Sequence, residues 1–167
     1  MASQRVTSGV RAEVFIHTEP AVTWRMWTDP NELPRWFPGV ASVTIQDAAA
    51  DGANARVRIE GPDTVEIEIL TAEELTELTY RLPGAFGDLK PHTGTILVKA
   101  SLTGTEVDWT VKLDDESRGF LGLGGSKGSV QRSMQAALDA LKTLLEAEAY
   151  RRPEVDTDVR RSRWDDI

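Results

Sequence analysis

The sequence predicts a single α+β domain in which a curved, seven-stranded antiparallel sheet grips a long C-terminal helix. Two observations predict this class. The segment from Ser129 to Tyr150 has an unbroken helical period, with apolar residues at steps of three and four: Val130, Met134, Ala137, Leu138, Leu141, Leu144 and Leu145. Most of the chain before this segment consists of short runs that alternate apolar and polar residues, as half-buried strands do.

The apolar stripe of the predicted helix needs a large partner. Burying six such side chains contributes about 9 to 18 kcal/mol before conformational entropy is subtracted. The only comparable apolar surface that the sequence offers is one face of the predicted sheet. We therefore expect the helix to lie on that face, with space between them for a ligand.

The N-terminal part predicts one strand and two short helices. Residues 10–16 alternate apolar and polar side chains, which predicts the first strand. Pro20 suits the first turn of a helix that runs to about Trp27. Asp29 followed by proline predicts the start of a second helix, with Glu32 completing a capping box. The two helices carry many of the aromatic residues of the chain, among them Trp24, Trp27, Trp36 and Phe37.

Six further strands follow as a meander, and we expect them at 40–47, 54–60, 64–71, 75–82, 92–101 and 105–113. Short connections rich in Gly, Pro and Asp, such as 61–63 and 103–104, favour antiparallel neighbours. Strand parity directs Tyr80, His92 and Trp109 to the inner face.

Two loops are longer and rich in glycine, at 83–91 and 114–128. Each carries one phenylalanine, Phe86 or Phe120, which predicts mobile lids over an apolar opening. We expect the second to be a gate that contains three flexible glycines: Gly122, Gly124 and Gly125. The glycine spacing of that run fits neither a phosphate-binding loop nor a dinucleotide fingerprint.

The domain is expected to end at residue 152. Residues 153–167 carry mixed charge without periodicity, which predicts a disordered tail.

Composition narrows the class of partner. The 167-residue chain has a net charge of −8 and a pI near 4.8, which argues against nucleic acid or anionic membranes as the main partner. It has no cysteine, no apolar run of eighteen residues and no signal-peptide pattern, so we expect a cytoplasmic protein without membrane insertion. No histidine or acid cluster predicts a metal site, and no cofactor is expected.

Several motifs resemble a known superfamily. Segments 22–24, 27–30 and 33–39 resemble the "VW…TDP…L…WFPG" stretch of the Bet v1/START-like helix-grip superfamily, also called SRPBCC. Segments 92–96 and 104–111 resemble the last paired strands of its polyketide cyclase/dehydrase-like branch. The first stretch also resembles the Hsp90-activator-homology branch. The resemblance covers about residues 10–150 and implies the helix-grip fold.

The resemblance implies a ligand between the sheet and the long helix. The expected ligand-binding residues are Trp27, Trp36, Tyr80, Phe86, His92, Trp109, Phe120, Met134 and Leu138. His92 is a candidate general acid or base and Tyr80 a candidate partner for a ligand carbonyl. Each of them also fits a structural role, His92 as a hydrogen-bonded or solvated strand end and Tyr80 as a core residue whose hydroxyl reaches a backbone partner, and the pattern favours these structural roles.

Four functions are compatible with this pattern. The leading hypothesis is a protein that binds or sequesters a polyketide-like or lipid-like molecule in bacterial secondary metabolism. The second is an aromatase/cyclase, with His92 and Tyr80 as catalytic residues. The third, implied by the resemblance alone, is a self-sacrificing resistance protein that an enediyne antibiotic cleaves at a loop glycine. The fourth is interaction with a chaperone.

Overall fold

The structure is a computed structural model that describes residues 9–47, 55–114 and 125–165, with side chains described in the last range for 127–150. Its elements follow in the order β1 (Gly9–Ile16), α1 (Pro20–Thr28), η2 (Pro30–Glu32), α2 (Leu33–Trp36), β2 (Ser42–Asp47), β3 (Arg56–Glu60), β4 (Thr64–Glu73), β5 (Glu77–Leu82), β6 (His92–Ala100), β7 (Thr105–Leu113) and α4 (Gly125–Asp165).

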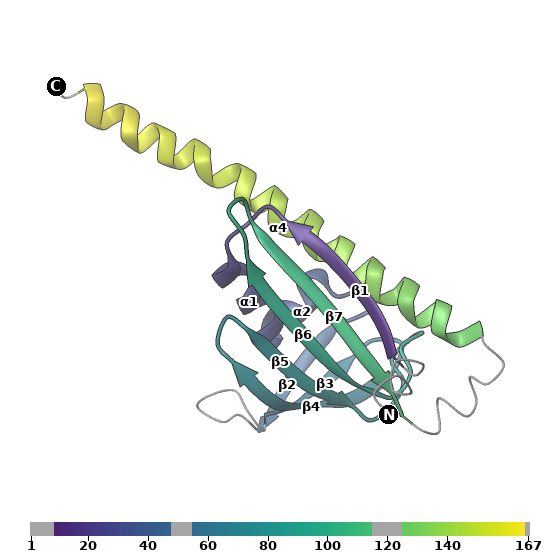
Figure 1. The fold of residues 1–167 in the computed structure, drawn as a ribbon. Coiled ribbons are helices and arrows are strands. Elements are labelled where there is room, and N and C mark those ends of the chain that lie inside the picture. The colour runs from purple at the N-terminus through teal and green to yellow at the C-terminus, as the bar shows by residue number, and fades with distance from the viewer. Residues whose placement is uncertain (1–8, 48–54, 115–124, 166–167) are drawn as a thin grey trace.

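The strands form one antiparallel sheet in the order β1-β7-β6-β5-β4-β3-β2 (Figure 1). The predicted meander of six strands is therefore confirmed as β2 to β7, in which each strand pairs with its sequence neighbour, and β1 pairs with β7 at the edge opposite β2. The register shifts between Ile45 and Asp47 in β2 and between Ile69 and Thr71 in β4. Such irregularities bend strands, which helps the sheet to curve.

The short helices after β1 lie against the inner side of the sheet. Pro20 occupies the first turn of α1 as expected. The carboxylate of Asp29 accepts a hydrogen bond from the Asn31 amide at 3.0 Å and thereby caps η2. The predicted capping box does not form, because the Glu32 carboxylate accepts a bond from Arg35 instead.

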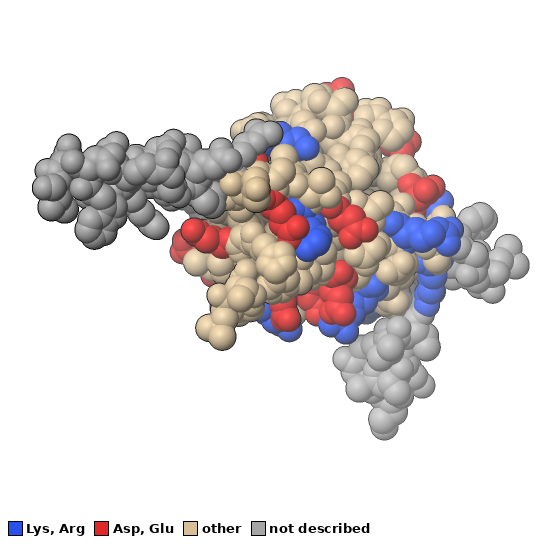
Figure 2. Space-filling view, turned by 90° about the horizontal axis from the view of Figure 1, so that it is seen from above, with Lys and Arg blue, Asp and Glu red and all other residues tan. Residues whose placement is uncertain are grey.

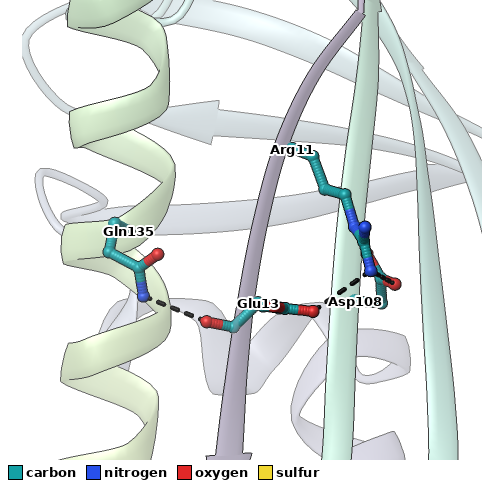
Figure 3. Close-up of polar contacts among 4 residues, drawn as sticks. All are labelled: Arg11, Glu13, Asp108 and Gln135. Atoms are coloured by element: carbon teal, nitrogen blue, oxygen red, sulfur yellow. Dashed lines mark hydrogen bonds and ion pairs between the residues drawn. The ribbon is translucent and has the colours of Figure 1, made fainter.

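Helix α4 lies along β1, at the edge of the sheet (Figure 1). Figure 3 shows how the two are joined: the Gln135 side-chain amide donates to the backbone carbonyl of Glu13 at 3.2 Å. On the other side of β1, Arg11 forms an ion pair with Asp108 of β7 at 2.6 Å. Strand β1 is thus tied to a neighbour on each side.

Two more α4 side chains form hydrogen bonds with the outer backbone edge of β1 and with the residue just after this strand. Lys142 Nζ donates to the carbonyl of Phe15 at 2.7 Å, and the carboxylate of Glu146 accepts from the amide of His17 at 3.0 Å. An edge strand exposes unpaired backbone groups that can template aggregation. The polar side chains of α4 cover these groups in place of an eighth strand.

The apolar face of α4 is buried as its period predicts, with Val130, Met134, Leu138, Leu141 and Leu145 all fully enclosed. The helix also begins earlier and ends later than expected, at Gly125 and Asp165, and its C-terminal part extends beyond the sheet (Figure 1). The backbone is therefore helical where the sequence predicts a disordered tail from Pro153. Arg and Glu in this segment are good helix formers, whereas Pro153 has no N–H and donates no backbone hydrogen bond.

Acidic and basic side chains are interspersed on the face that Figure 2 presents. Ion pairs also join neighbouring strands, such as Arg56 of β3 with Asp47 of β2 at 2.6 Å. Within the described ranges, no helix is long and apolar enough to cross a membrane.

Candidate functional site

An apolar cavity of about 70 Å³ lies between the inner face of the sheet and the segment from α1 to Phe37. Strands β3 to β7 and the loop after β5 supply the rest of its wall. The lining residues are Trp27, Thr28, Pro30, Leu33, Phe37, Val57, Ile59, Ile67, Ile69, Leu78, Tyr80, Leu82, Phe86, Leu89, His92, Ile96 and Trp109. Nearly all of them are aliphatic or aromatic, which is typical of sites for hydrophobic small molecules.

Three polar side chains of the wall form one chain of hydrogen bonds. Trp109 Nε1 lies 3.0 Å from the Tyr80 hydroxyl, which lies 2.7 Å from His92 Nε2. His92 Nδ1 in turn lies 2.6 Å from the carbonyl oxygen of Lys90. Tyr80, His92 and Trp109 are all buried, on three adjacent strands, as strand parity predicts.

Chemistry fixes the direction of this chain. The Lys90 carbonyl can only accept, so Nδ1 of His92 carries a proton and donates it. In the neutral imidazole Nε2 is then an acceptor, so the Tyr80 hydroxyl donates to it. The indole of Trp109 can only donate, and it donates to the Tyr80 oxygen. Every member is satisfied in this single arrangement.

Burial keeps the chain neutral. It lowers the pKa of His92, against a smaller opposing effect of the hydrogen bond to Lys90 and of the nearby Asp114. Burial likewise raises the pKa of the Tyr80 hydroxyl, which the hydrogen bond from Trp109 only partly offsets. At neutral pH the cavity wall therefore carries an uncharged imidazole and an uncharged phenol.

Gly94 makes room for this arrangement. It is the register partner of Tyr80 on β6, and a Cβ atom at Gly94 would lie 2.3 Å from the Tyr80 ring. Real side chains do not approach so closely. The missing side chain therefore lets the tyrosine lie across β6, where its hydroxyl reaches His92 and Trp109.

An aromatic cluster forms the end of the cavity beside α1. The indole of Trp27 makes edge-to-face contacts with Trp36 and Trp109, at ring-centre distances of 4.8 and 5.4 Å. Trp36 Nε1 donates to the carbonyl of Met26 at 3.2 Å. Trp27 Nε1, by contrast, is buried and has no hydrogen-bond acceptor within the described part of the chain.

The loop after β5 closes another side. Phe86 and Leu89 exchange two backbone hydrogen bonds and turn both side chains inward, where they are buried. The Phe86 ring rests against the backbone of Gly61, where an added Cβ would approach it to 2.9 Å. Gly87, at φ +59°, donates from its amide to the carboxylate of Asp63 at 2.8 Å and fixes the turn to the β3–β4 connection.

A second, outer groove of about 120 Å³ borders the same loop and reaches α4 at Ser133 and Ala136. Phe37, Phe86 and Leu89 line both the groove and the inner cavity. These three side chains are therefore the partition between the cavity and the outside groove.

The predicted site residues divide into three groups. Trp27, Tyr80, Phe86, His92 and Trp109 line the cavity. Trp36, Met134 and Leu138 are buried but do not line it. Phe120, Gly122 and Gly124 lie outside the described residues, and Gly125 is the first residue of α4 instead of part of a loop.

Met134 and Leu138 miss the cavity because α4 lies at the β1 edge, whereas the cavity lies over β3 to β7. Trp36 misses it because its indole turns toward α1 to reach Met26. Sequence reasoning in turn overlooked the isoleucines of β3 and β4 and the turn residue Leu89. Alternation along β3 and β4 carries a signal for the former, while nothing in the sequence places Leu89.

Among the described residues, no three His, Asp or Glu side chains come together in a way that could hold a metal ion. Among the described residues of the wall, Tyr80 and His92 are the pair between which a proton can pass.

Comparison with known families agrees with this architecture. The profile of the family described as "Polyketide cyclase / dehydrase and lipid transport" matches residues 8–146. The chain belongs to this family. No curated protein sequence matches it significantly.

Solved structures similar to this cyclase/dehydrase family member share its fold at low identity. DynU16, a protein of the dynemicin biosynthetic locus, has a TM-score of 0.64 at 17% identity, over 83% of this chain and 47% of that one. The di-domain ARO/CYC StfQ of the steffimycin biosynthetic pathway has a TM-score of 0.63 at 15% identity, and the match covers 89% of this chain and 55% of that one. The present chain thus spans about half of each. The Aha1 dimer from Colwellia psychrerythraea has a TM-score of 0.64 at 11% identity, and the match covers 83% of this chain and 96% of that one.

Proposed function

We propose that this protein binds a hydrophobic, polyketide-like small molecule in the cavity between the sheet and the α1–α2 segment. The observation that carries this proposal is a cavity wall made almost entirely of apolar side chains, with its few polar groups satisfied mainly among themselves. Such a wall offers a large gain from apolar burial and little to a charged ligand. The family description, and the biosynthetic origins of the structural neighbours DynU16 and StfQ, favour a polyketide over other apolar molecules.

Size adds a requirement. At about 70 Å³, the cavity is smaller than the roughly 300 to 1,000 Å³ of ordinary ligand sites. A ligand with several rings must therefore displace part of the wall. Phe37, Phe86 and Leu89 are the side chains whose outward movement would join the cavity to the outer groove. We expect the loop that carries Phe86 to move when a ligand binds.

Native mass spectrometry of the protein purified from a polyketide-producing bacterium, followed by extraction of bound molecules, tests the proposal. Wild-type protein should retain a hydrophobic compound. Ile67→Trp, which fills the cavity from β4, should lose it. Ile45→Trp is the matched control, because Ile45 is exposed on β2 and does not line the cavity. Equal retention by the two variants would place the bound compound elsewhere and contradict the proposal.

The Tyr80–His92 pair favours one second candidate function, an aromatase/cyclase. A ligand carbon could lose a proton to the Tyr80 oxygen while the hydroxyl proton passes to His92 Nε2, 2.7 Å away. The products of this step are an enolate on the ligand and an imidazolium whose Nδ1 proton is held by Lys90. An enolate formed beside an electrophilic carbonyl of the same chain can close a ring.

Turnover of a poly-β-ketone thioester separates the two functions. If the protein is a cyclase, Tyr80→Phe and His92→Gln should each slow cyclisation by about 10²-fold to 10⁴-fold while the ligand is still bound. Cyclisation at the wild-type rate in both variants would exclude these roles. The hypotheses of antibiotic self-sacrifice and of chaperone interaction stay predictions from the sequence resemblance.

A further inference from the structure

The hydrogen-bond donors of the cavity wall are satisfied with one exception. The Trp109 indole donates to Tyr80 and the Tyr80 hydroxyl to His92. The Thr28 hydroxyl donates to the carbonyl of Trp24 at 3.0 Å. Trp27 Nε1 alone, among the buried side-chain nitrogens and oxygens of the described residues, has no partner.

The exception is not a general property of the tryptophans here. The Trp36 indole, which packs against that of Trp27, donates a hydrogen bond to the Met26 carbonyl. The Trp109 indole donates one to the Tyr80 hydroxyl. Buried polar groups without a partner are rare in folded proteins, because each one loses its bonds to water and gains nothing. Trp27 is 8% exposed and lines the cavity, while its Nε1 atom is itself buried. A ligand that displaces part of the wall, as the size of the cavity requires, would uncover this donor and supply the missing acceptor.

We infer that Trp27 is the polar specificity contact of the cavity, and that the cavity selects ring compounds that carry an acceptor oxygen, such as aryl ketones, over hydrocarbons of the same shape. The inference rests on the proposed function and sharpens it, since it separates oxygenated polyketide-like ligands from unfunctionalised lipid chains. Among the described residues the wall offers no other unsatisfied donor, so there an acceptor on the ligand has one place to bind.

A matched pair of ligands tests this directly. Acetophenone and α-methylstyrene have nearly the same shape, and they differ in a carbonyl oxygen against a methylene group. Wild-type protein should prefer acetophenone, and Trp27→Phe, which keeps an aromatic ring but removes the donor, should lose that preference. The ratio of the two affinities should fall by roughly 5-fold to 140-fold, the range expected when a buried oxygen loses its only donor. The affinity of α-methylstyrene in the variant controls for the change in volume.

A second measurement needs no variant. In protein labelled with ¹⁵N at the indole nitrogens, acetophenone should move the Trp27 Nε1–H proton resonance downfield, and α-methylstyrene should not. The resonance of Trp36, whose indole already donates to Met26, is the internal control.

The outcomes separate the two proposals. If both ligands bind equally and shift the Trp27 resonance alike, the indole N–H is satisfied by the ring face of a neighbour such as Trp109, and the specificity inference is overturned while the cavity proposal stands. If neither ligand binds, the cavity proposal fails and the inference fails with it. An affinity ratio that is unchanged in Trp27→Phe overturns the inference alone.

Discussion

Removing one hydroxyl group tests the hydrogen-bond chain of the cavity wall. Tyr80→Phe keeps the ring and takes away the oxygen that accepts from Trp109 at 3.0 Å and donates to His92 at 2.7 Å. Both partners are buried, so water does not replace the lost bonds. The substitution leaves the Trp109 indole N–H and the His92 Nε2 without partners.

The magnitude follows from these two groups. A buried polar group left unsatisfied costs about 1 to 3 kcal/mol, while removal of the buried hydroxyl itself returns part of its desolvation cost. We therefore expect the free energy of unfolding to fall by about 2 to 5 kcal/mol, a large part of the 5 to 15 kcal/mol that is typical of a domain. Equilibrium urea unfolding at pH 7.5, followed by tryptophan fluorescence, measures this fall, with an unchanged m-value expected.

The chain offers a matched control. Tyr150→Phe removes the same hydroxyl from a side chain on α4 that is 78% exposed, so stability should change by no more than about 0.5 kcal/mol. If Tyr80→Phe also costs less than about 0.5 kcal/mol, Tyr80 does not hold Trp109 and His92 in the arrangement described, and the reasoning is refuted.

Three further predictions concern other links of the structure. Gly94→Ala should lower the free energy of unfolding by about 2 to 4 kcal/mol, because the new Cβ displaces the Tyr80 ring. In Tyr80→Leu protein the same substitution should cost much less, and a double-mutant cycle in urea measures the difference. Burial lowers the pKa of His92 in the folded protein, so the unfolded chain binds the proton more tightly. The contribution of neutral His92 to the free energy of unfolding should be fully present above about pH 6.5 and should fall as the pH drops below it. His92→Gln should flatten this fall between about pH 7 and 5. Lys142→Met should cost about 0.5 to 1.5 kcal/mol in urea unfolding, because it removes the donor to the β1 edge.

Each of these predictions has its own control or contradicting outcome. Gly128→Ala, at an open position in α4, should leave stability unchanged or raise it by up to about 1 kcal/mol. A pH profile that is the same in wild type and His92→Gln would show that His92 is not held neutral by burial. Lys99→Met, at an exposed position on β6, should leave the free energy of unfolding nearly unchanged. If Lys142→Met and Lys99→Met lower it equally, the hydrogen bond from Lys142 to the β1 edge does not stabilise the fold.

Strand parity was enough to predict much of the site. Alternation along β5, β6 and β7 put Tyr80, His92 and Trp109 on one face, and the structure joins them by hydrogen bonds. Parity alone could not show that Gly94 would let the tyrosine cross a strand, since this depends on the register between β5 and β6. Register is a property of pairing between distant segments, which a single sequence does not display.

The position of α4 was the main feature beyond reach of the sequence. Its period predicted which side chains are buried, and Met134 and Leu138 are indeed enclosed. The period says nothing about where along the sheet the helix lies. The bonds from Gln135 and Lys142 to the β1 backbone place it at the edge, and the cavity is therefore walled by the α1–α2 segment instead.

The central claim is that the apolar cavity is the ligand site, and the isoleucine methyl groups test it most directly. Four isoleucines line the cavity, at positions 59, 67, 69 and 96, whereas Ile16 is buried outside it and Ile45 is exposed. Titration of ¹³C-methyl-labelled protein with acetophenone and with 1-naphthol should shift the four cavity methyl resonances and leave those of Ile16 and Ile45 in place. Shifts confined to Ile45, or no shift at saturating ligand, would contradict the account.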